Sequence, residues 1–146
     1  MMSLVIKKFK ELTLEELYEI LKVRVGVFVV EQKCAYQEID EKDKQSLHLY
    51  FRDSKGIQAY LRVLPAGLSY KEVSIGRVIT LKRGCGLGGE ILKEGIKVAQ
   101  ERFQANTIRI GAQVYAKGFY EKFGFKQVSK EYIEDGIAHI QMLLQR

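Results

Sequence analysis

The stretch Arg83-Gly84-Cys85-Gly86-Leu87-Gly88-Gly89 decides the fold, because it sets four glycines in six residues between two segments of opposite character. The β-branched run from Val73 to Thr80 predicts a strand before it, and Glu90 to Gln104 has the apolar spacing of a helix after it. Glycine at this density indicates positive φ angles or a ligand that comes closer than a Cβ allows. Because the first N–H groups of a helix lack partners and lie at its positive dipole end, the turn suits an anion such as phosphate. The alternative is a tight structural turn without a ligand.

The residues before this turn predict a strand and a helix. Ser3 to Phe9 is typical of a short strand, and the capping box Thr13-Leu14-Glu15-Glu16 begins the helix. We extend the helix to about Val30 because of its cap and length, although alternate valines from Val23 to Val29 also fit a strand. One helical face carries six apolar residues, namely Leu14, Leu17, Tyr18, Leu21, Val25 and Phe28.

A polar, acidic connection and a hairpin follow this helix. Glu31 to Lys44 is a long connection, and connections of this length are often functional. Leu47 to Arg52 and Ile57 to Leu64 both alternate, and they are joined at Asp53-Ser54-Lys55-Gly56. They therefore predict a pair of antiparallel strands.

The residues after the glycine turn predict a strand, Thr107 to Gly111, and a short helix, Tyr115 to Lys122. Phe125 to Ile133 and Ile137 to Leu144 then form a terminal hairpin around Glu134-Asp135-Gly136. The whole order is not a regular βαβ repeat. It predicts an α/β protein of the α+β type, with a mixed sheet and helices packed on its faces.

Length and composition bound the class of protein. We expect a single domain over residues 1–146, because a chain of this size can bury a real core without disulfides. The formal charge of +6 favours an anionic ligand, but there is no RNA-binding aromatic pattern or zinc-finger spacing, so we expect no nucleic acid. The two cysteines, Cys34 and Cys85, have no metal-binding or redox spacing. With no signal segment or membrane span, we expect a soluble, unprocessed, cytoplasmic protein without a metal.

The glycine turn also has look-alikes. Gly84, Gly86 and Gly89 satisfy the dinucleotide-binding pattern, which further requires an acidic residue about twenty positions on. That place holds Ile110-Gly111-Ala112-Gln113, which has no carboxylate. No Lys-Ser or Lys-Thr pair follows the last glycine, so a Walker-type loop is excluded.

A third pattern fits better. Arg83-x-x-Gly86-x-Gly88 at a strand-to-helix turn resembles motif A of the GNAT acetyltransferases, and Phe119 to Phe125 resembles their later Y-x-x-x-GF segment. The resemblance narrows to the ElaA family, whose segments run along most of the chain: Leu21 to Tyr36, Gln37 to Asp40, Ala59 to Gly67, Ile75 to Val78, Ala112-Gln113 and Tyr132 to His139. The passage from Arg77 to Arg83 departs from that family by being about two residues shorter, and Cys85 and Ala138 replace its usual residues.

The resemblance implies the GNAT fold, with a mostly antiparallel sheet, and acetyl-coenzyme A as co-substrate. The glycine turn would hold the pyrophosphate, the pantetheine arm would follow the strand, and an N–H of Val78 or Ile79 would polarise the thioester carbonyl. The coenzyme set is therefore Val78, Ile79, Thr80, Arg83, Gly84, Cys85, Gly86, Leu87, Gly88, Gly89 and Gln113. Tyr120 would protonate the departing thiolate, with a core tyrosine bonded to backbone as the alternative.

The acceptor amine must lose a proton, so a base is needed. Glu31, Glu38, Asp40 and His139 are candidates, of which we assign Glu38 and His139 to catalysis with Tyr120. His48 is expected to be a hydrogen-bonded structural histidine.

The acceptor side is assigned to Arg24, Glu31 and Arg77. Arg24 and Arg77 stand in apolar settings, so each either makes an internal salt bridge, binds a carboxylate-bearing acceptor or shapes the acceptor pocket.

The resemblance predicts an N-acetyltransferase acting on a small-molecule or peptide amine, with a homodimer through edge strands as a plausible assembly. The alternatives are a non-catalytic acyl-coenzyme A sensor and an acyl-homoserine-lactone-synthase-like enzyme. The latter class lacks the glycine turn, which argues against it here.

Overall fold

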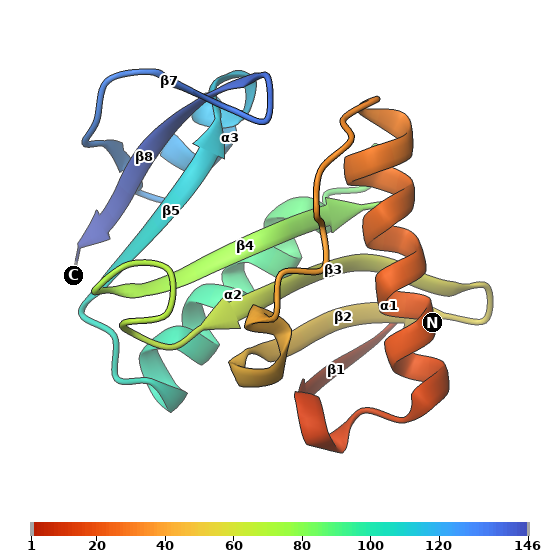
Figure 1. Cartoon of the computed structure of the whole chain (residues 1–146). Coiled ribbons are helices and arrows are strands. Elements are labelled where there is room, and N and C mark those ends of the chain that lie inside the picture. Colours follow the sequence, from red (N-terminus) through yellow and green to blue (C-terminus); the bar gives the residue numbers. More distant parts are fainter. Residues whose placement is uncertain (1, 146) are drawn as a thin grey trace.

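The computed structural model describes residues 2–145, and their strands form an eight-stranded sheet in the order β1-β2-β3-β4-β5-β8-β6, with β7 also beside β8. The strands are β1 Ser3–Lys8, β2 Leu47–Asp53, β3 Gly56–Leu64, β4 Val73–Thr80, β5 Thr107–Gln113, β6 Lys126–Gln127, β7 Tyr132–Glu134 and β8 Ile137–Gln145. The helices are α1 Leu14–Val25, α2 Leu87–Arg102 and α3 Lys117–Glu121. Neighbouring strands are antiparallel except β4 and β5. The predicted fold class is confirmed, with α1 and α2 on opposite faces of the sheet (Figure 1).

The alternation of β3 explains the two layers. Leu61 and its neighbours two positions away are fully buried in the larger core against α2, whereas Tyr60 points to the smaller core under α1. Gly95 of α2 lies directly on this strand, since a Cβ there would be 2.9 Å from Leu61 Cδ2. Helix and sheet therefore approach more closely than an alanine at this position would allow. The full burial of Leu61 that results contributes about 1.5–3 kcal/mol to the stability of the fold.

The N-terminus of α1 is capped as predicted. Thr13 Oγ1 accepts from the Glu16 N–H at 3.1 Å, and the Glu16 carboxylate accepts from the Thr13 N–H at 2.9 Å. After Val25 the helix does not stop but widens into a π-helical turn, Gly26–Glu31. The helical interpretation of the alternating valines is confirmed, and such wide turns are frequent at functional sites.

The apolar face predicted for α1 points outward at its N-terminal end, whereas Phe28 at its other end packs against the smaller core. Leu14 is 87% exposed and Tyr18 is 74% exposed. The buried side instead carries Ile20 and Arg24, both fully buried. The sequence pattern pointed to the wrong face because a charged residue occupies the inside of this helix, where its charge is paired.

Glu16 gives the fold a measurable acid sensitivity. Burial acts to raise the pKa of its carboxyl, but hydrogen bonds from Lys7, the Thr13 N–H and Tyr50 outweigh burial and lower it to about 2, from an ordinary value of 4.5. A lowered folded-state pKa stabilises above pH 4.5, and this contribution is lost as the pH falls toward 2. Glu16→Gln should therefore destabilise by roughly 1–3 kcal/mol at pH 6. Urea unfolding from pH 6 to pH 3 should show the gap between variant and native protein shrinking, and a constant gap contradicts the assignment.

The terminal hairpin differs from the prediction. Phe125 to Ile133 is not one strand, because Lys126 lies opposite Leu143 while Tyr132 lies opposite His139. From Lys126 to Tyr132 the chain advances six residues, whereas the opposite residues of β8, from Leu143 to His139, are only four apart. Two residues between β6 and β7 therefore bulge out of the ladder. The Ser129 hydroxyl accepts from the backbone N–H of Gln141 at 2.8 Å, which fills the gap in the ladder.

Candidate active site

A wedge-shaped cleft opens between β4 and β5, because these parallel strands pair only at Val73 with Ile108 and Ser74 with Arg109. Beyond Ser74 the two strands diverge, as Figure 1 shows. The outer edge of β4 is therefore free of a strand partner up to Thr80. The short passage from Arg77 to Arg83 does not prevent this separation.

A cavity of about 980 Å³ occupies this wedge. Of the predicted site residues, those that line it are Glu31, Arg77, Val78, Ile79, Thr80, Arg83, Gln113, Tyr120 and His139. Arg24 and Glu38 lie behind its wall, where both are buried. The remaining coenzyme residues, Gly84 to Gly89, continue from Arg83 into α2 and are not part of the cavity lining.

β4 carries a bulge that the sequence did not predict. Tyr60 pairs with Ile79 and Arg62 pairs with Gly76, so Arg77 and Val78 together face the single residue Leu61. Arg77 has a φ of 54°, the left-handed conformation. For a residue with a Cβ this costs about 1–3 kcal/mol and persists only where surrounding contacts impose it. Such bulges redirect backbone groups, here those of Val78 and Ile79 beside the cleft.

The side chain of Arg77 supplies those contacts. Its Nε donates to the Glu38 carboxylate, and its Nη2 donates to the Glu38 carbonyl oxygen at 2.9 Å and to Asp40 Oδ2 at 3.3 Å. The guanidinium carbon also lies 5.9 Å from the ring centre of Phe28 and 5.7 Å from that of Tyr36. Arg77 thus joins the bulge to the end of the α1 region and to the acidic connection.

Arg77 belongs to a network of six charged side chains, four of them buried and two half-buried. Its members are Arg24, Arg62, Arg77, Glu38, Asp40 and Asp43. Arg24, which is fully buried, donates to Glu38 at 3.0 Å and to Asp43 at 2.6 Å. Arg62 donates to Asp40 at 2.6 Å and to Asp43 at 2.9 Å. Three positive and three negative charges balance, as burial requires.

This network bears on the interpretation of Arg24 and Arg77. Both arginines make internal salt bridges, as one of the interpretations predicts, and Arg77 also lines the cavity. Glu38 Oε2 accepts from both Arg24 and Arg77, so this carboxylate joins the two arginines behind the wall of the cavity. Burial acts to raise the pKa of Asp43, but the hydrogen bond and charge of Arg24, together with Arg62, hold it below its usual range.

The glycine turn has the geometry of an open helix start. Gly84 and Gly86 have φ angles of 83° and 78°, and Gly86 is the N-cap. The helix begins at Leu87 rather than Glu90, and its first intrahelical bond runs from the Glu90 N–H to the Gly86 carbonyl at 3.2 Å. The three preceding N–H groups have no helical acceptor, and no side chain caps them. The Arg83 guanidinium donates to Glu31 at 3.0 Å, which links the glycine turn to the end of the π-helical turn.

Tyr120 projects into the cavity from α3. Its ring packs edge-on against Phe119 at 5.1 Å and against Phe125 at 5.8 Å. Within residues 2–145 its hydroxyl has no hydrogen-bond partner, so the alternative of a backbone-bonded core tyrosine is not observed. Burial, helped by Tyr115, raises its pKa well above the ordinary 10, so the hydroxyl stays protonated.

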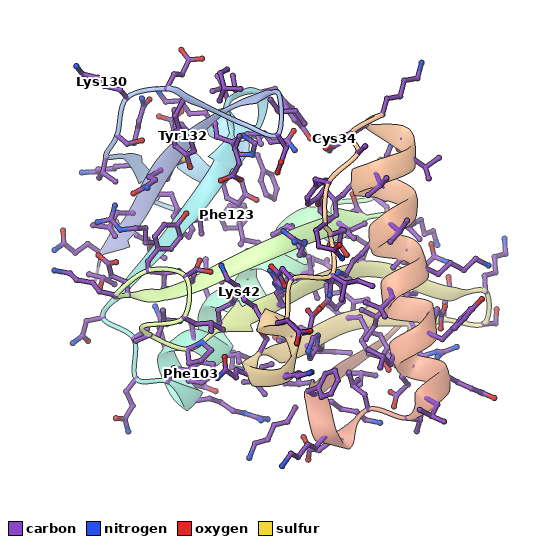
Figure 2. All side chains as sticks on the ribbon, in the orientation of Figure 1. Cys34, Lys42, Phe103, Phe123, Lys130 and Tyr132 are labelled. Atoms are coloured by element: carbon purple, nitrogen blue, oxygen red, sulfur yellow. The ribbon has the colours of Figure 1, made fainter. Side chains whose placement is uncertain are left out.

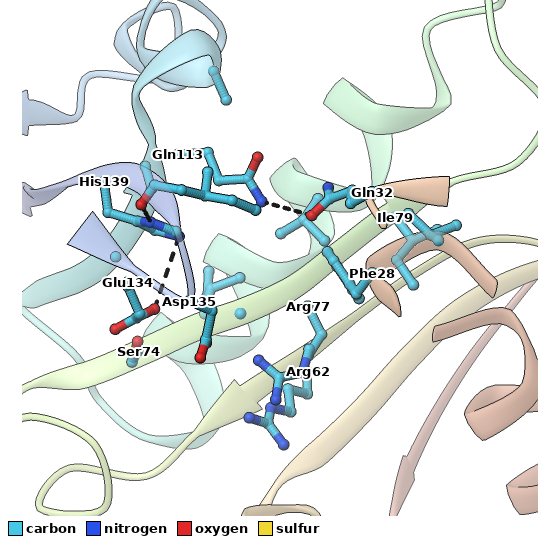
Figure 3. A pocket seen from close by; sticks show the side chains of 18 of the residues that line it. Phe28, Gln32, Arg62, Ser74, Arg77, Ile79, Gln113, Glu134, Asp135 and His139 are labelled. Atoms are coloured by element: carbon cyan, nitrogen blue, oxygen red, sulfur yellow. Dashed lines mark hydrogen bonds and ion pairs between the residues drawn. The ribbon is translucent and has the colours of Figure 1, made fainter. Parts of the chain in front are cut away.

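His139 lies across the cleft on β8, opposite Gln113 of β5 (Figure 3). Its Nδ1 is 2.8 Å from the carbonyl oxygen of Ile137, an acceptor, so Nδ1 is assigned the proton. In the neutral ring this leaves the lone pair on Nε2, 3.8 Å from a Glu134 carboxylate oxygen. The ring stacks on Tyr132 at 5.9 Å. A proton taken up at Nε2 would gain Glu134 as an ion-pair partner.

Two contacts join the walls of the cleft, and sequence reasoning gave neither. Gln113 donates to the side-chain oxygen of Gln32 at 3.1 Å, drawn in Figure 3. The Cys34 thiol donates to the carbonyl oxygen of Asp135 at 3.2 Å, and Figure 2 labels Cys34 on the segment after α1. Because the partners are 81 and 101 residues apart, no local pattern signalled them.

The remaining expectations concern a histidine, the two cysteines, metal binding and the membrane. His48 is buried, with Nδ1 2.7 Å from the Tyr60 hydroxyl and Nε2 2.9 Å from the Asp43 carbonyl, so its structural role is confirmed. Cys34 and Cys85 are free thiols. Residues 2–145 contain no group of three or more His, Cys, Asp or Glu side chains placed to hold a metal. No helix in that range is long and apolar enough to cross a membrane.

The fold and the cleft define an acyltransferase of the GNAT class, and a family model described as an acetyltransferase (GNAT) domain matches residues 14–146. The chain is 36% identical over 136 residues to the protein ElaA of Escherichia coli, covering 90% of this chain and 89% of that one. The crystal structure of E. coli ElaA covers 99% of this chain and all of its own, with a TM-score of 0.92 and 33% identity. The chain belongs to the ElaA family of GNAT acyltransferases.

Two further solved structures have a similar fold, one at high and one at low sequence identity. A crystal structure described as an acyl-CoA N-acyltransferase from Pseudomonas aeruginosa has a TM-score of 0.93 and 36% identity, with 99% of each chain covered. A CoA-dependent acyl-homoserine lactone synthase, solved with SAM and isopentyl-CoA, has a TM-score of 0.81 but only 10% identity, with 99% of this chain and 83% of that one covered. The second likeness shows the fold alone.

Proposed function

We propose that this protein is an N-acetyltransferase that transfers the acetyl group of acetyl-coenzyme A to an amine by direct attack. One observation carries the proposal. A single cleft begins beside a helix start whose N–H groups have no acceptor, follows the unpaired edge of β4, and ends between the Tyr120 hydroxyl and His139 Nε2.

The residues present fit the coenzyme. Free N–H groups at the positive end of a 16-residue helix suit a pyrophosphate. A Cβ on Gly89 would lie 3.2 Å from Phe123, and one on Gly88 would lie 3.4 Å from Thr80, so the start of the helix is packed against these side chains. A Cβ on Gly84 or Gly86 would meet nothing within 4 Å, so the turn itself is open. The unpaired edge of β4 offers backbone groups to the amides of the pantetheine arm, as an added strand does.

The chemistry then needs three groups of this chain. The acceptor nitrogen bonds to the acetyl carbon while the carbon–sulfur bond breaks, and a backbone N–H of the β4 bulge stabilises the charge on the carbonyl oxygen. His139 Nε2 takes the proton lost by the nitrogen, and Glu134 stabilises the resulting imidazolium. The sulfur leaves as a thiolate beside the Tyr120 hydroxyl.

Tyr120 acts here as a hydrogen-bond donor rather than as a strong acid. A thiol has a pKa near 8.5. The raised pKa of Tyr120 therefore makes complete proton transfer unfavourable, whereas a hydrogen bond to the forming thiolate lowers the barrier. Solvent can complete the protonation once the product leaves.

The competing function is an acyl-coenzyme A sensor without turnover. Tyr120, whose hydroxyl has no partner, and His139, whose Nε2 carries a lone pair, line the same cleft. A sensor needs neither group there, so this geometry favours the enzyme. The lactone-synthase-like alternative rests on a solved structure only 10% identical to this chain, which shows the fold alone.

The deciding experiment measures thiol release from acetyl-coenzyme A in the presence of an amine panel, alongside calorimetric binding of coenzyme A. Release that depends on one class of amine, and that falls at least tenfold in His139→Asn with unchanged coenzyme binding, supports the proposal. Tight binding without release for every amine favours the sensor. Absence of binding contradicts both.

A further inference from the structure

The outward face of α1 carries a continuous apolar stripe made of Leu14, Tyr18, Leu21 and Val25, hereafter the α1 stripe. Leu14 and Tyr18 are 87% and 74% exposed, and Leu21 and Val25 are half-buried. Spacings of four, three and four residues place them in one row along the helix. Because α1 packs on the sheet through its other side, at Ile20 and Arg24, this row faces away from the core. Contiguous exposed apolar surface of this kind marks an interaction site.

The order of residues in the α1 stripe is self-complementary. When two copies of the helix run antiparallel about a two-fold axis between Glu19 and Ile20, Leu14 lies opposite Val25 of the second copy. Tyr18 then lies opposite Leu21 of the second copy. Each apolar side chain therefore meets an apolar partner, as an isologous interface between identical chains requires.

The charges beside the stripe select the same arrangement. Glu15 and Lys22 are exposed, unpaired within residues 2–145, and seven residues apart, so they flank the stripe on one side. With the same axis, Lys22 of the second copy lies at the height of Leu17 of the first copy. This is two residues from Glu15, or about 3 Å along the helix axis. In a parallel two-fold pair the flank that carries Glu15 and Lys22 would lie on opposite sides of the stripe in the two copies, so these residues would not meet. Opposite charges meet only in the antiparallel pair, which sets partner and orientation.

We propose that this protein forms a homodimer through the α1 stripe, with the two α1 helices antiparallel and Glu15–Lys22 pairs at the margin. This places the interface on a helix face rather than on the edge strands β1 or β6. A single helix pair is smaller than the standard interface of about 1,600 Å², so micromolar rather than nanomolar association is expected.

Sedimentation equilibrium from 1 to 200 µM tests the proposal on the full chain. The native protein should pass from monomer to dimer, and Leu14→Ser with Tyr18→Ser should raise the dissociation constant at least tenfold. Glu15→Lys alone should raise it about threefold to tenfold, and Glu15→Lys with Lys22→Glu should restore it. Ile133→Ser, which removes an apolar residue 71% exposed on β7, serves as the control and should change nothing. Far-UV circular dichroism confirms that each variant folds.

Three results would overturn the proposal. The first is a native protein that stays monomeric at 200 µM. The second is a dimer that survives Leu14→Ser with Tyr18→Ser, which would place the contact at an edge strand. The third is a charge swap that fails to restore association. A monomer that binds anionic phospholipid vesicles through the α1 stripe would assign this face to a membrane surface instead.

Discussion

Tyr120→Phe should lower the turnover number about 100-fold while the affinity for acetyl-coenzyme A stays within a factor of three. The variant loses only the hydroxyl that donates to the leaving thiolate, and donors of this kind contribute about 10²–10⁴-fold. The ring contacts with Phe119 and Phe125 remain, so binding and folding are preserved. Steady-state kinetics of thiol release and calorimetric titration with acetyl-coenzyme A separate the two quantities.

Tyr115→Phe is the matched control for this experiment. It removes the same hydroxyl from a side chain 81% exposed at the rim of the cleft, five positions away. Its turnover should stay within twofold of the native value. Unchanged turnover in Tyr120→Phe would remove Tyr120 from the mechanism, whereas equal losses in both variants would point to a general effect on the rim.

Arg77→Gly should lower turnover about 10- to 100-fold, again with little change in coenzyme affinity. Glycine adopts the φ of 54° without strain, so the substitution removes the anchor of the bulge without forcing the backbone elsewhere. In this variant each carboxylate still has a salt bridge, because Glu38 remains paired with Arg24 and Asp40 remains paired with Arg62. The freed bulge should no longer hold its N–H on the thioester carbonyl, and one such donor contributes about 10²–10³-fold.

Infrared spectroscopy separates positioning from a loss of folded protein. With acetyl-coenzyme A labelled with ¹³C at the carbonyl, the bound band of the native protein should lie below that of the free molecule. In Arg77→Gly the band should return toward the free position. Arg109→Gly removes an arginine of similar exposure that pairs with Glu72 outside the cavity, and it should keep the shifted band. A bound band unmoved by Arg77→Gly would rule out Arg77 as a positioning residue.

Local patterns were sufficient wherever a residue acts through its own neighbours in the chain. The Thr13–Glu16 cap, the alternation of β2 and β3, and the glycine turn were predicted correctly, because capping, pleating and positive φ are properties of a few consecutive residues. The same patterns misplaced the outer face of α1 and joined β6 to β7. A charged residue inside a helix and a bulge in a strand both depend on distant partners.

The sequence by itself determined the family, the order of most elements and the glycine turn between a strand and a helix, since these rest on residue types at short, regular spacings. Only the tertiary structure decided what the charged residues do. Arg24, Glu38 and Arg77 became parts of one balanced network because folding brings residues 14 to 39 positions apart within hydrogen-bond distance. The divergence of β4 from β5, which opens the cleft, likewise depends on how strands pair across the sheet. No spacing along the chain records that pairing.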